Sequence, residues 1–397
     1  MTSEMLNYIS KETGGKSMLV CLVGSRAYGY ELLDSDTDYA VYIPGTSRLT
    51  GRKIGNTDLW FFPMTELPCL GQGEYQHLPD MARIKYCSSQ ALKKYIEENR
   101  DAILLADMPG VYRSLLAAAD EAAGTGELRY RKSVAESVVR GAYVLDQYFR
   151  TGKLRFALST ECVAVIRAIK RGVIAPEDVE KYMYGVTDEK LRSFFYAKGT
   201  DYETLIKFKF ALIHANKDRE GEIVLSDYEI AMAKYLVAFA TGEGLDDARA
   251  ALKEYEPSAA QAVAVLQMMI RAVFNDTLPT AAEAEEKIAT LATELDALGF
   301  KTVCPVELLL NALRLNIKIA ENSPIDADDC TTLITSIYKG LVAALTASGG
   351  MRKAIAGVCI KAMMDIGTLT KNTLVSTALL KMLDIDSDGV DFAFPFN

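Results

Sequence analysis

The chain has 397 residues, of which 50% are hydrophobic and 24% charged, and its formal net charge is −9. This length supports two or three domains with substantial cores, and the composition is that of an ordinary globular protein, which excludes a largely disordered chain. Residues 1–6 lack the basic and apolar regions of a signal peptide and no run of about 20 apolar residues could span a bilayer, so we expect a cytoplasmic protein.

The first predicted elements are two short apolar runs separated by a turn. Residues 18–23 and 39–43 are rich in strand formers, and each is stopped by glycine or by Pro-Gly, as buried strands are. Between them runs GSRAYGYELLDSDTD, residues 24–38. This order predicts a strand, a tight turn, a short helical or looped link, and a second strand that opens on aspartates.

Residues 24–38 combine two features that favour phosphate chemistry. Asp36 and Asp38 are two positions apart, so in a strand they project from the same side about 7 Å apart, and paired carboxylates are suitable ligands for magnesium. Gly24 lets the backbone approach a phosphate closely, and Ser25 is a suitable anion donor. Alone, a Gly-Ser pair is usually a turn and DSDTD a solvated loop, but together, between two predicted strands, they favour a functional site.

Other phosphate motifs and histidine-based chemistry fit the sequence poorly. GSRAYG has the glycine spacing of a P-loop, but Tyr30 and Glu31 stand where lysine and serine or threonine are required. Only His77 and His214 are available for a zinc site or a Ser-His-Asp triad, and His214 lies on an apolar helical run where we expect a structural role. The seven cysteines are scattered without a CxxC pair, which favours reduced, buried thiols. Two-metal phosphate chemistry is the main enzymatic option that remains.

The spacing of these residues resembles a known signature. Gly24-Ser25 followed by Ser35-Asp36-Thr37-Asp38 resembles the Gly-Ser…Asp-x-Asp motif of the DNA polymerase β nucleotidyltransferase superfamily. The longer string GSRAYG…DSDTD is most similar to the predicted bacterial and phage nucleotidyltransferases of the RNA-repair-associated (RlaP-like) branch. The resemblance implies that Asp36 and Asp38 hold magnesium, that the Gly-Ser turn grips the nucleotide phosphates, and that a third carboxylate comes from a later strand. Asp34 precedes the matched motif and ranks third among the three aspartates.

The third carboxylate is expected on a strand predicted at residues 57–62, which opens with Asp58 and ends at Pro63. In the RlaP-like branch an acidic residue opens such a strand, ahead of a helix in the position of residues 64–70. There it would ligate a metal ion and accept the proton of an attacking hydroxyl. Alternatively, Asp58 merely opens a strand beside a turn, with Glu66 and Asp80 as reserve candidates. Residues 64–90 otherwise predict an irregular excursion.

Helices are predicted from Ser88 onward, first at 88–99. Residues 127–171 contain ten Lys or Arg against four acidic residues, a local net charge of +6, which suits a polyphosphate or nucleic-acid surface, although such charges often form only a solvated helix face. The resemblance covers roughly residues 17–215, with matching helical segments at 137–140, 151–157 and 166–172, and favours phosphate contacts by Lys132 and Arg140. A histidine of the family is absent before Arg140, with Glu136 or Ser137 in its place.

Residues 226–383 predict a separate all-helical domain whose role the sequence does not specify. The expected helices are 228–240, 248–255, 259–274, 281–298, 306–319, 331–345, 353–366 and 374–383.

The C-terminus contains two further patterns. Residues 384–389 match the start of an EF-hand loop, but Pro395 occupies the position of the bidentate glutamate, which argues against calcium binding. Phe392, Phe394 and Phe396 alternate, so an extended tail presents all three rings on one side. We expect this tail to pack on its own domain. The alternative is docking in the groove of a partner or of a second copy.

The sequence therefore predicts an α+β protein with three parts: a small mixed-sheet nucleotidyltransferase catalytic domain (1–120), a helical domain with a basic face (121–220) and a C-terminal all-helical domain (221–397). The expected activity is transfer of a nucleoside monophosphate from a nucleoside triphosphate such as ATP to an acceptor hydroxyl, with two Mg²⁺ ions and an RNA 3′ end as the favoured acceptor. Alternatives are transfer to a protein or a small molecule, or a non-catalytic nucleotide-binding, RNA-binding or scaffold protein. The predicted site comprises Asp36, Asp38 and Asp58 as metal ligands and Gly24, Ser25, Arg26, Lys132 and Arg140 as nucleotide contacts.

Overall fold

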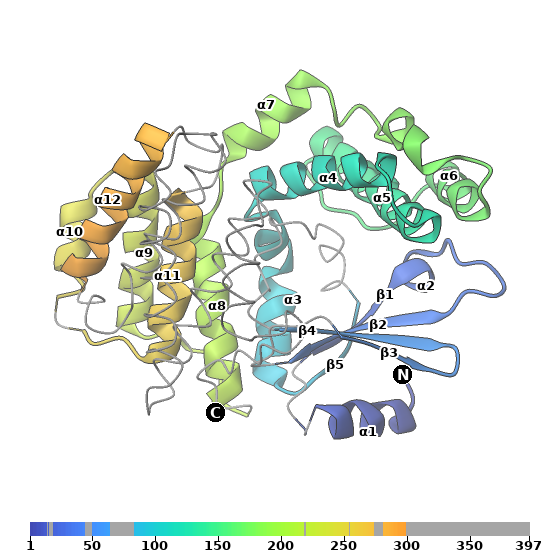
Figure 1. The fold of residues 1–397 in the computed structure, drawn as a ribbon. Helices are drawn as coiled ribbons and strands as arrows, with labels where there is room; N and C mark the ends of the chain where they lie inside the picture. The colour runs from blue at the N-terminus through green and yellow to red at the C-terminus, as the bar shows by residue number, and fades with distance from the viewer. Residues whose placement is uncertain are drawn as a thin grey trace, which may run out of the picture. The chain divides into compact units, whose positions relative to one another are not determined.

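The computed structural model describes residues 1–13, 15, 19–43, 50–63, 83–217, 220–253, 255–273 and 281–298 (Figure 1). They form two compact units. The first contains the described residues from 1 to 201 together with 220 and 221, and the second contains 202–217 and the described residues from 222 onward.

A five-stranded sheet forms the centre of the first unit, with the order β3-β4-β2-β1-β5. The strands are β1 (Leu19–Val23), β2 (Thr37–Ile43), β3 (Thr50–Ile54), β4 (Thr57–Pro63) and β5 (Ile84–Cys87). β2 and β4 run parallel, whereas all other neighbours are antiparallel. The sheet is therefore mixed and is accompanied by many helices, which confirms the α+β expectation at this level.

One face of the sheet is covered by helix α1 (Ser3–Glu12) (Figure 1). The side chain of Thr2 caps α1 by accepting a hydrogen bond from the backbone N–H of Met5. Ile9 of α1 packs into an apolar cluster contributed by the central strands, with Val20, Tyr39, Val41, Leu59 and Phe61. Side chains alternate along a strand, so Asp58 and Trp60, which flank Leu59, face the opposite side of the sheet.

The link between β1 and β2 follows the predicted pattern of strand, tight turn, short helix and strand. Gly24 has a φ of 68° and begins helix α2 (Gly24–Tyr28). A Cβ at this position would lie 2.8 Å from Cγ of Asp38, so both the backbone angle and the close approach of Asp38 require glycine. The turn thus brings the end of β1 directly against the start of β2.

Helices make up the rest of the first unit: α3 (Gln90–Leu105), α4 (Met108–Ala123), α5 (Leu128–Thr151), α6 (Thr160–Arg171), the 3₁₀-helix η4 (Pro176–Tyr182) and α7 (Glu189–Lys198). The predicted helix at 88–99 is present as α3, capped by Ser89, whose side chain accepts from the N–H of Leu92. Helices α4, α5 and α6 lie on the side of the sheet away from α1 (Figure 1).

Two strands went unrecognised in the sequence. β5 falls within residues 64–90, where an irregular excursion was expected, and β3 is a polar edge strand with a single apolar residue, Ile54. Both owe their conformation to pairing with a neighbour, β5 with β1 and β3 with β4. Neither has the apolar run by which a strand is recognised.

The second unit is helical, with α8 (Tyr202–Lys217), α9 (Asp227–Thr241), α10 (Leu245–Ala250), α11 (Ala259–Val273) and α12 (Ala281–Ala297). The predictions for α9, α11 and α12 are correct to within a residue or so. The helix predicted at 248–255 is wrong in position, because α10 begins right after Gly244 and carries Asp246 and Asp247 in its first turn, where acidic side chains stabilise a helix start. The helices predicted beyond residue 305 lie outside the described residues.

The domain boundaries predicted near residues 120 and 220 stay a prediction. The first compact unit contains both the sheet and helices α4–α7, and the second begins at Tyr202. Within the described part of the chain, no helix combines the length and the apolar character needed to cross a membrane.

Candidate metal centre

Three aspartates of the first unit converge on one point. Asp38 lies on β2 and Asp58 is its direct partner on the parallel strand β4, while Asp36 immediately precedes β2. Each offers a carboxylate oxygen, and these oxygens all lie within 4.8 Å of one another. This cluster could hold a metal ion, and its hard oxygen donors suit Mg²⁺. Asp34 is exposed and does not belong to the cluster.

The carboxylates repel one another. Burial and the charges of Asp36 and Asp58 raise the pKa of Asp38 to about 6, although a hydrogen bond from the Trp60 side chain and the charge of Lys170 partly oppose this. Burial and the hydrogen bond with Asp36 raise the pKa of Asp58 as well. The pKa of Asp36 is lowered instead, because its burial is outweighed by its hydrogen bonds with Asp58 and Lys53. Two of the three carboxylates thus resist ionisation, and a bound cation would favour their charged forms.

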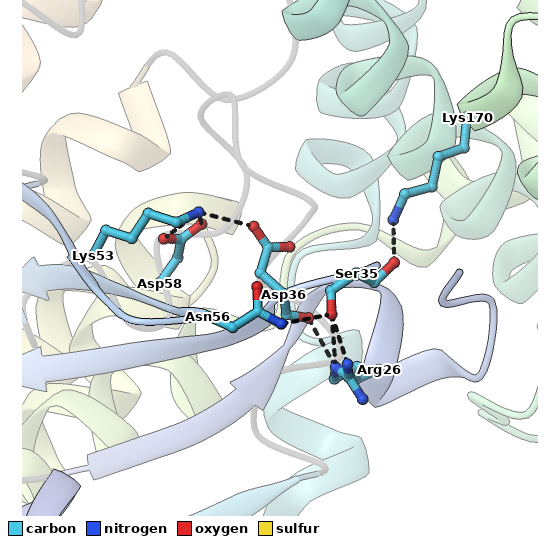
Figure 2. Close-up of polar contacts among 7 residues, drawn as sticks. All are labelled: Arg26, Ser35, Asp36, Lys53, Asn56, Asp58 and Lys170. Atoms are coloured by element: carbon cyan, nitrogen blue, oxygen red, sulfur yellow. Dashed lines mark hydrogen bonds and ion pairs between the residues drawn. The ribbon is translucent and has the colours of Figure 1, made fainter. Parts of the chain in front are cut away.

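A lysine that sequence reasoning missed lies between two of these aspartates. Nζ of Lys53 on β3 is 3.4 Å from Oδ2 of Asp36 and 3.3 Å from Oδ1 of Asp58 (Figure 2). The antiparallel pairing of β3 with β4 sets Lys53 opposite Asp58. Only recognition of a hairpin through the turn at Gly55-Asn56 could have indicated this pairing from the sequence.

The backbone ahead of β2 is held by a set of side-chain donors (Figure 2). Nη2 and Nε of Arg26 donate to the carbonyl oxygen of Ser35 at 2.6 and 3.2 Å, and Nε also donates to that of Asp36 at 3.0 Å. Nδ2 of Asn56 donates to the same Ser35 carbonyl at 3.3 Å. The structure therefore places Arg26, a predicted phosphate contact, as a positioning residue for Asp36.

Helix α6 contacts the same loop from the other side of the site. Nζ of Lys170 donates to the hydroxyl oxygen of Ser35 at 2.9 Å (Figure 2). Arg167, one turn earlier, donates to the carbonyl oxygens of Gly29 and Tyr30 at 3.3 and 3.4 Å. Two cations of the predicted basic stretch thus lie beside the loop that carries the aspartates. The sequence could not show which of the ten basic residues do so.

Arg140 on α5 is buried, with 4% of its surface exposed. Nη1 donates to the hydroxyl of Tyr30 at 2.9 Å, and the guanidinium lies over the ring of Tyr28, 4.4 Å from its centroid. Arg140, a predicted phosphate contact, therefore connects α5 to Tyr28 at the end of α2 and to Tyr30 in the loop that follows.

Glu136 lies one turn before Arg140 on α5. Burial raises its pKa to about 7, the charges of Lys170, Arg140 and Lys132 lower it, and the charge of Asp38 raises it. Lys132 is half-buried on the same helix. The protonation of Glu136 therefore depends on charges of α5, of α6 and of the aspartate cluster.

Gly24 and Ser25, the predicted phosphate-binding turn, lie directly beside the cluster. Gly24 packs against Asp38, and Ser25 is 5% exposed, with its carbonyl oxygen accepting the N–H of Tyr30 at 3.1 Å. The turn and the aspartates predicted to act together are thus adjacent.

Other predicted features have varied outcomes. The described residues do not include Glu66, Asp80, His77, the 384–395 segment or the Phe392–Phe396 tail. His214 lies with Nε2 2.8 Å from Oε2 of Glu229 inside the second unit, as a structural role requires. Cys21, Cys87 and Cys162 are buried, as predicted, while their reduced state stays a prediction.

Comparison of the chain with protein-family models, with curated proteins and with solved structures finds no match in any of the three.

Proposed function

We propose that the protein is a magnesium-dependent nucleotidyltransferase that moves a nucleoside monophosphate from a nucleoside triphosphate to an acceptor hydroxyl and releases pyrophosphate. The observation that carries the proposal is the convergence of Asp36, Asp38 and Asp58, with carboxylate oxygens within 4.8 Å of one another. The Gly24-Ser25 turn beside them supports it, as does the resemblance of this motif to the DNA polymerase β superfamily.

The residues divide into ligands, donors and positioning groups. Asp36, Asp38 and Asp58 would hold Mg²⁺, which when bound supplies positive charge to the reacting phosphate oxygens and the leaving group. Asp58 would accept the proton of the acceptor hydroxyl, a role that its raised pKa suits.

The phosphates would lie near Gly24 and Ser25, with Lys132 and Lys170 as cationic neighbours. Arg26 and Arg140 position the loop between α2 and β2 from either end.

The favoured acceptor is an RNA 3′ end, supported by the local charge of +6 over residues 127–171 in a chain of net charge −9.

A non-catalytic, nucleotide-sensing protein is the second candidate. It is favoured by Lys53, whose ammonium group already neutralises two of the three aspartates.

Incubation with labelled nucleoside triphosphates, Mg²⁺ and a pool of short RNAs tests the proposal, with the Asp36→Ala/Asp38→Ala double variant as control. Label in RNA from the wild-type chain alone is the expected result. Label in protein or in a small molecule would retain the chemistry and reject the RNA acceptor. No labelled product, together with nucleotide affinity indifferent to Mg²⁺, would reject the enzyme.

A further inference from the structure

An exposed aromatic side chain lies beside the aspartate cluster. Trp60 is the only tryptophan of the chain and follows Asp58 by two positions on β4, so both project from the same face of the sheet. Its surface is 39% exposed, whereas Phe62, the next residue on that face, is 6% exposed and stacks on Tyr42 with centroids 5.5 Å apart. The apolar surface of β4 is therefore covered at Phe62 and open at Trp60.

The indole of Trp60 reaches across three strands. At one end it lies close enough to Asp38 on β2 to lower the pKa of that carboxyl. At the other end its benzene ring lies over Gly51, the partner of Trp60 on β3, where a Cβ would stand 3.1 Å from Cζ3. A larger residue at position 51 would contact the ring. Glycine at this position therefore provides the space that the indole occupies against the sheet.

The strand order places Trp60 on one particular side of the reaction centre. Gly24 and Ser25 follow β1, the aspartates lie on or next to β2 and β4, and Trp60 extends from β4 toward the edge strand β3. In phosphoryl transfer the attacking and leaving oxygens stand roughly in line on opposite sides of the phosphorus. If the leaving pyrophosphate lies by the Gly-Ser turn, the attacking hydroxyl arrives from the side of Asp58 and Trp60.

We propose that Trp60, supported by Gly51, is a stacking platform for the terminal base of the acceptor, the 3′ end of a single-stranded RNA. This inference rests on the proposed function and names its acceptor. Every nucleobase has a π-face that stacks on an indole, whereas an aliphatic hydroxyl compound has none. Lys53 projects from the same face of β3 as Gly51, two positions away, where its ammonium group pairs with Asp36 and Asp58.

Intrinsic fluorescence tests the inference directly, because all tryptophan emission comes from Trp60. Titration of the full chain with a short single-stranded oligoadenylate in Mg²⁺ should change this emission with saturation. The same oligomer ending in an abasic residue should change it much less. Equal responses to both oligomers, or oligoadenylate binding by calorimetry without any change in emission, would overturn the platform.

Substitutions give the second measurement. Trp60→Leu should weaken oligoadenylate binding about 5- to 150-fold, as loss of one stacked base does, and Trp60→Phe should restore part of it. Phe149→Leu is the matched control, because Phe149 is 37% exposed and packs on Phe194 of α7. Unchanged oligoadenylate affinity in Trp60→Leu would contradict the inference.

Binding of Mg²⁺ and of nucleoside triphosphate, followed by calorimetry, separates this inference from the proposed function. Intact binding of both with no oligoadenylate binding overturns the RNA acceptor and the platform alone. If the wild-type chain binds neither Mg²⁺, nor nucleoside triphosphate, nor oligoadenylate, the nucleotidyltransferase proposal is overturned as well.

Discussion

Each unit of the molecule gathers carboxylates among its elements, but the two groups are neutralised to different degrees. In the first unit Asp36, Asp38 and Asp58 face one another, and the pKa of Asp38 is raised to about 6. In the second unit Glu229 on α9 is 1% exposed. Burial by itself would raise its pKa, but hydrogen bonds from the backbone of Ser226 and the side chain of His214 hold it below its ordinary value.

Two buried carboxylates in the described part of the second unit, Glu229 and Glu294, each have several hydrogen-bond partners. Glu229 accepts from the Ser226 N–H at 2.9 Å and from Nε2 of Gln261 at 2.8 Å, with His214 beside it. Glu294 on α12 accepts from the hydroxyl of Tyr235 at 2.9 Å and from Nε of Arg249 at 3.0 Å. Such groups fix helix positions and have little capacity left for a ligand.

The number of hydrogen-bond donors around a carboxylate distinguishes a structural carboxylate from a functional one. A carboxylate surrounded by donors is stabilised in its charged form, whereas in the aspartate cluster Lys53 pairs with only Asp36 and Asp58, and the pKa values of Asp38 and Asp58 are raised. Convergence of acidic groups without matching donors is a property of functional sites. Four predictions follow from this contrast, in order of expected effect.

The largest effect is expected for Asp38→Asn. Loss of one metal ligand should reduce nucleotidyl transfer about a thousand-fold or more, as removal of several kcal/mol of transition-state stabilisation does. The free energy of unfolding should not fall, because the substitution removes a charge that burial and two neighbours oppose. Labelled-nucleotide assays and urea denaturation measure the two quantities. Asp34→Asn, an exposed neighbour outside the cluster, should change neither, and a stability loss for Asp38→Asn would make the cluster structural.

Glu229→Ala should show the reverse pattern. Removing this carboxylate leaves His214 and Gln261 without their partner and should lower the free energy of unfolding by about 3 kcal/mol. Mg²⁺ affinity of the first unit should stay the same. Denaturation and calorimetry on the same preparation test both statements, and Asp227→Ala, an exposed position on the same helix, is the control. A drop in Mg²⁺ affinity would contradict the assignment of separate roles.

Glu136 predicts a pH effect in the first unit. Its pKa is about 7 in the folded protein against an ordinary value of 4.5, so the folded state holds its proton more tightly than the unfolded state. The resulting stabilisation is complete below pH 4.5 and is lost as pH rises through about 7.

Glu136→Gln should remove this dependence and raise the free energy of unfolding at pH 8 by about 2 kcal/mol, a value reduced from the full pKa shift because the side chain is partly solvated. Urea denaturation at several pH values measures it. Parallel pH profiles of the wild type and the variant would show that Glu136 does not titrate there.

The smallest effect is expected for Lys53→Gln. Its ammonium group lies against Asp36 and Asp58 and competes with any metal ion for their charge. The variant should therefore bind Mg²⁺ more tightly in calorimetric titrations. Arg52→Gln provides the comparison, because Arg52 projects from the other face of β3 and lies 3.8 Å from Glu12 of α1. Weaker Mg²⁺ binding in Lys53→Gln would mean that the lysine holds the aspartates in place instead.

The local part of the site was predictable because it is contiguous. The β1 strand, the turn at Gly24 and the start of β2 lie within about 20 residues, and the glycine, the apolar runs and the two aspartates each have a local sequence signal. Asp58 could be predicted as well, because its strand reads as a β-rich run. Helix α3 and the long helices of the second unit were recognisable from their periodicity and caps.

The sequence by itself thus determined the strand–turn–strand unit, the aspartate pair and the helices of the described part of the second unit, since these depend on residues close together in the chain. Only the tertiary structure decided which charges meet the aspartates. Lys53 reaches the cluster through the pairing of the edge strand β3 with β4. Trp60 reaches Asp38 because β4 pairs with β2, and Lys170 lies on a helix, 135 positions from Ser35 in the sequence. The sequence shows that a residue is basic but not which group its side chain contacts. The burial of Arg140 and the loop contacts of Arg26 follow from tertiary packing, which no local pattern specifies.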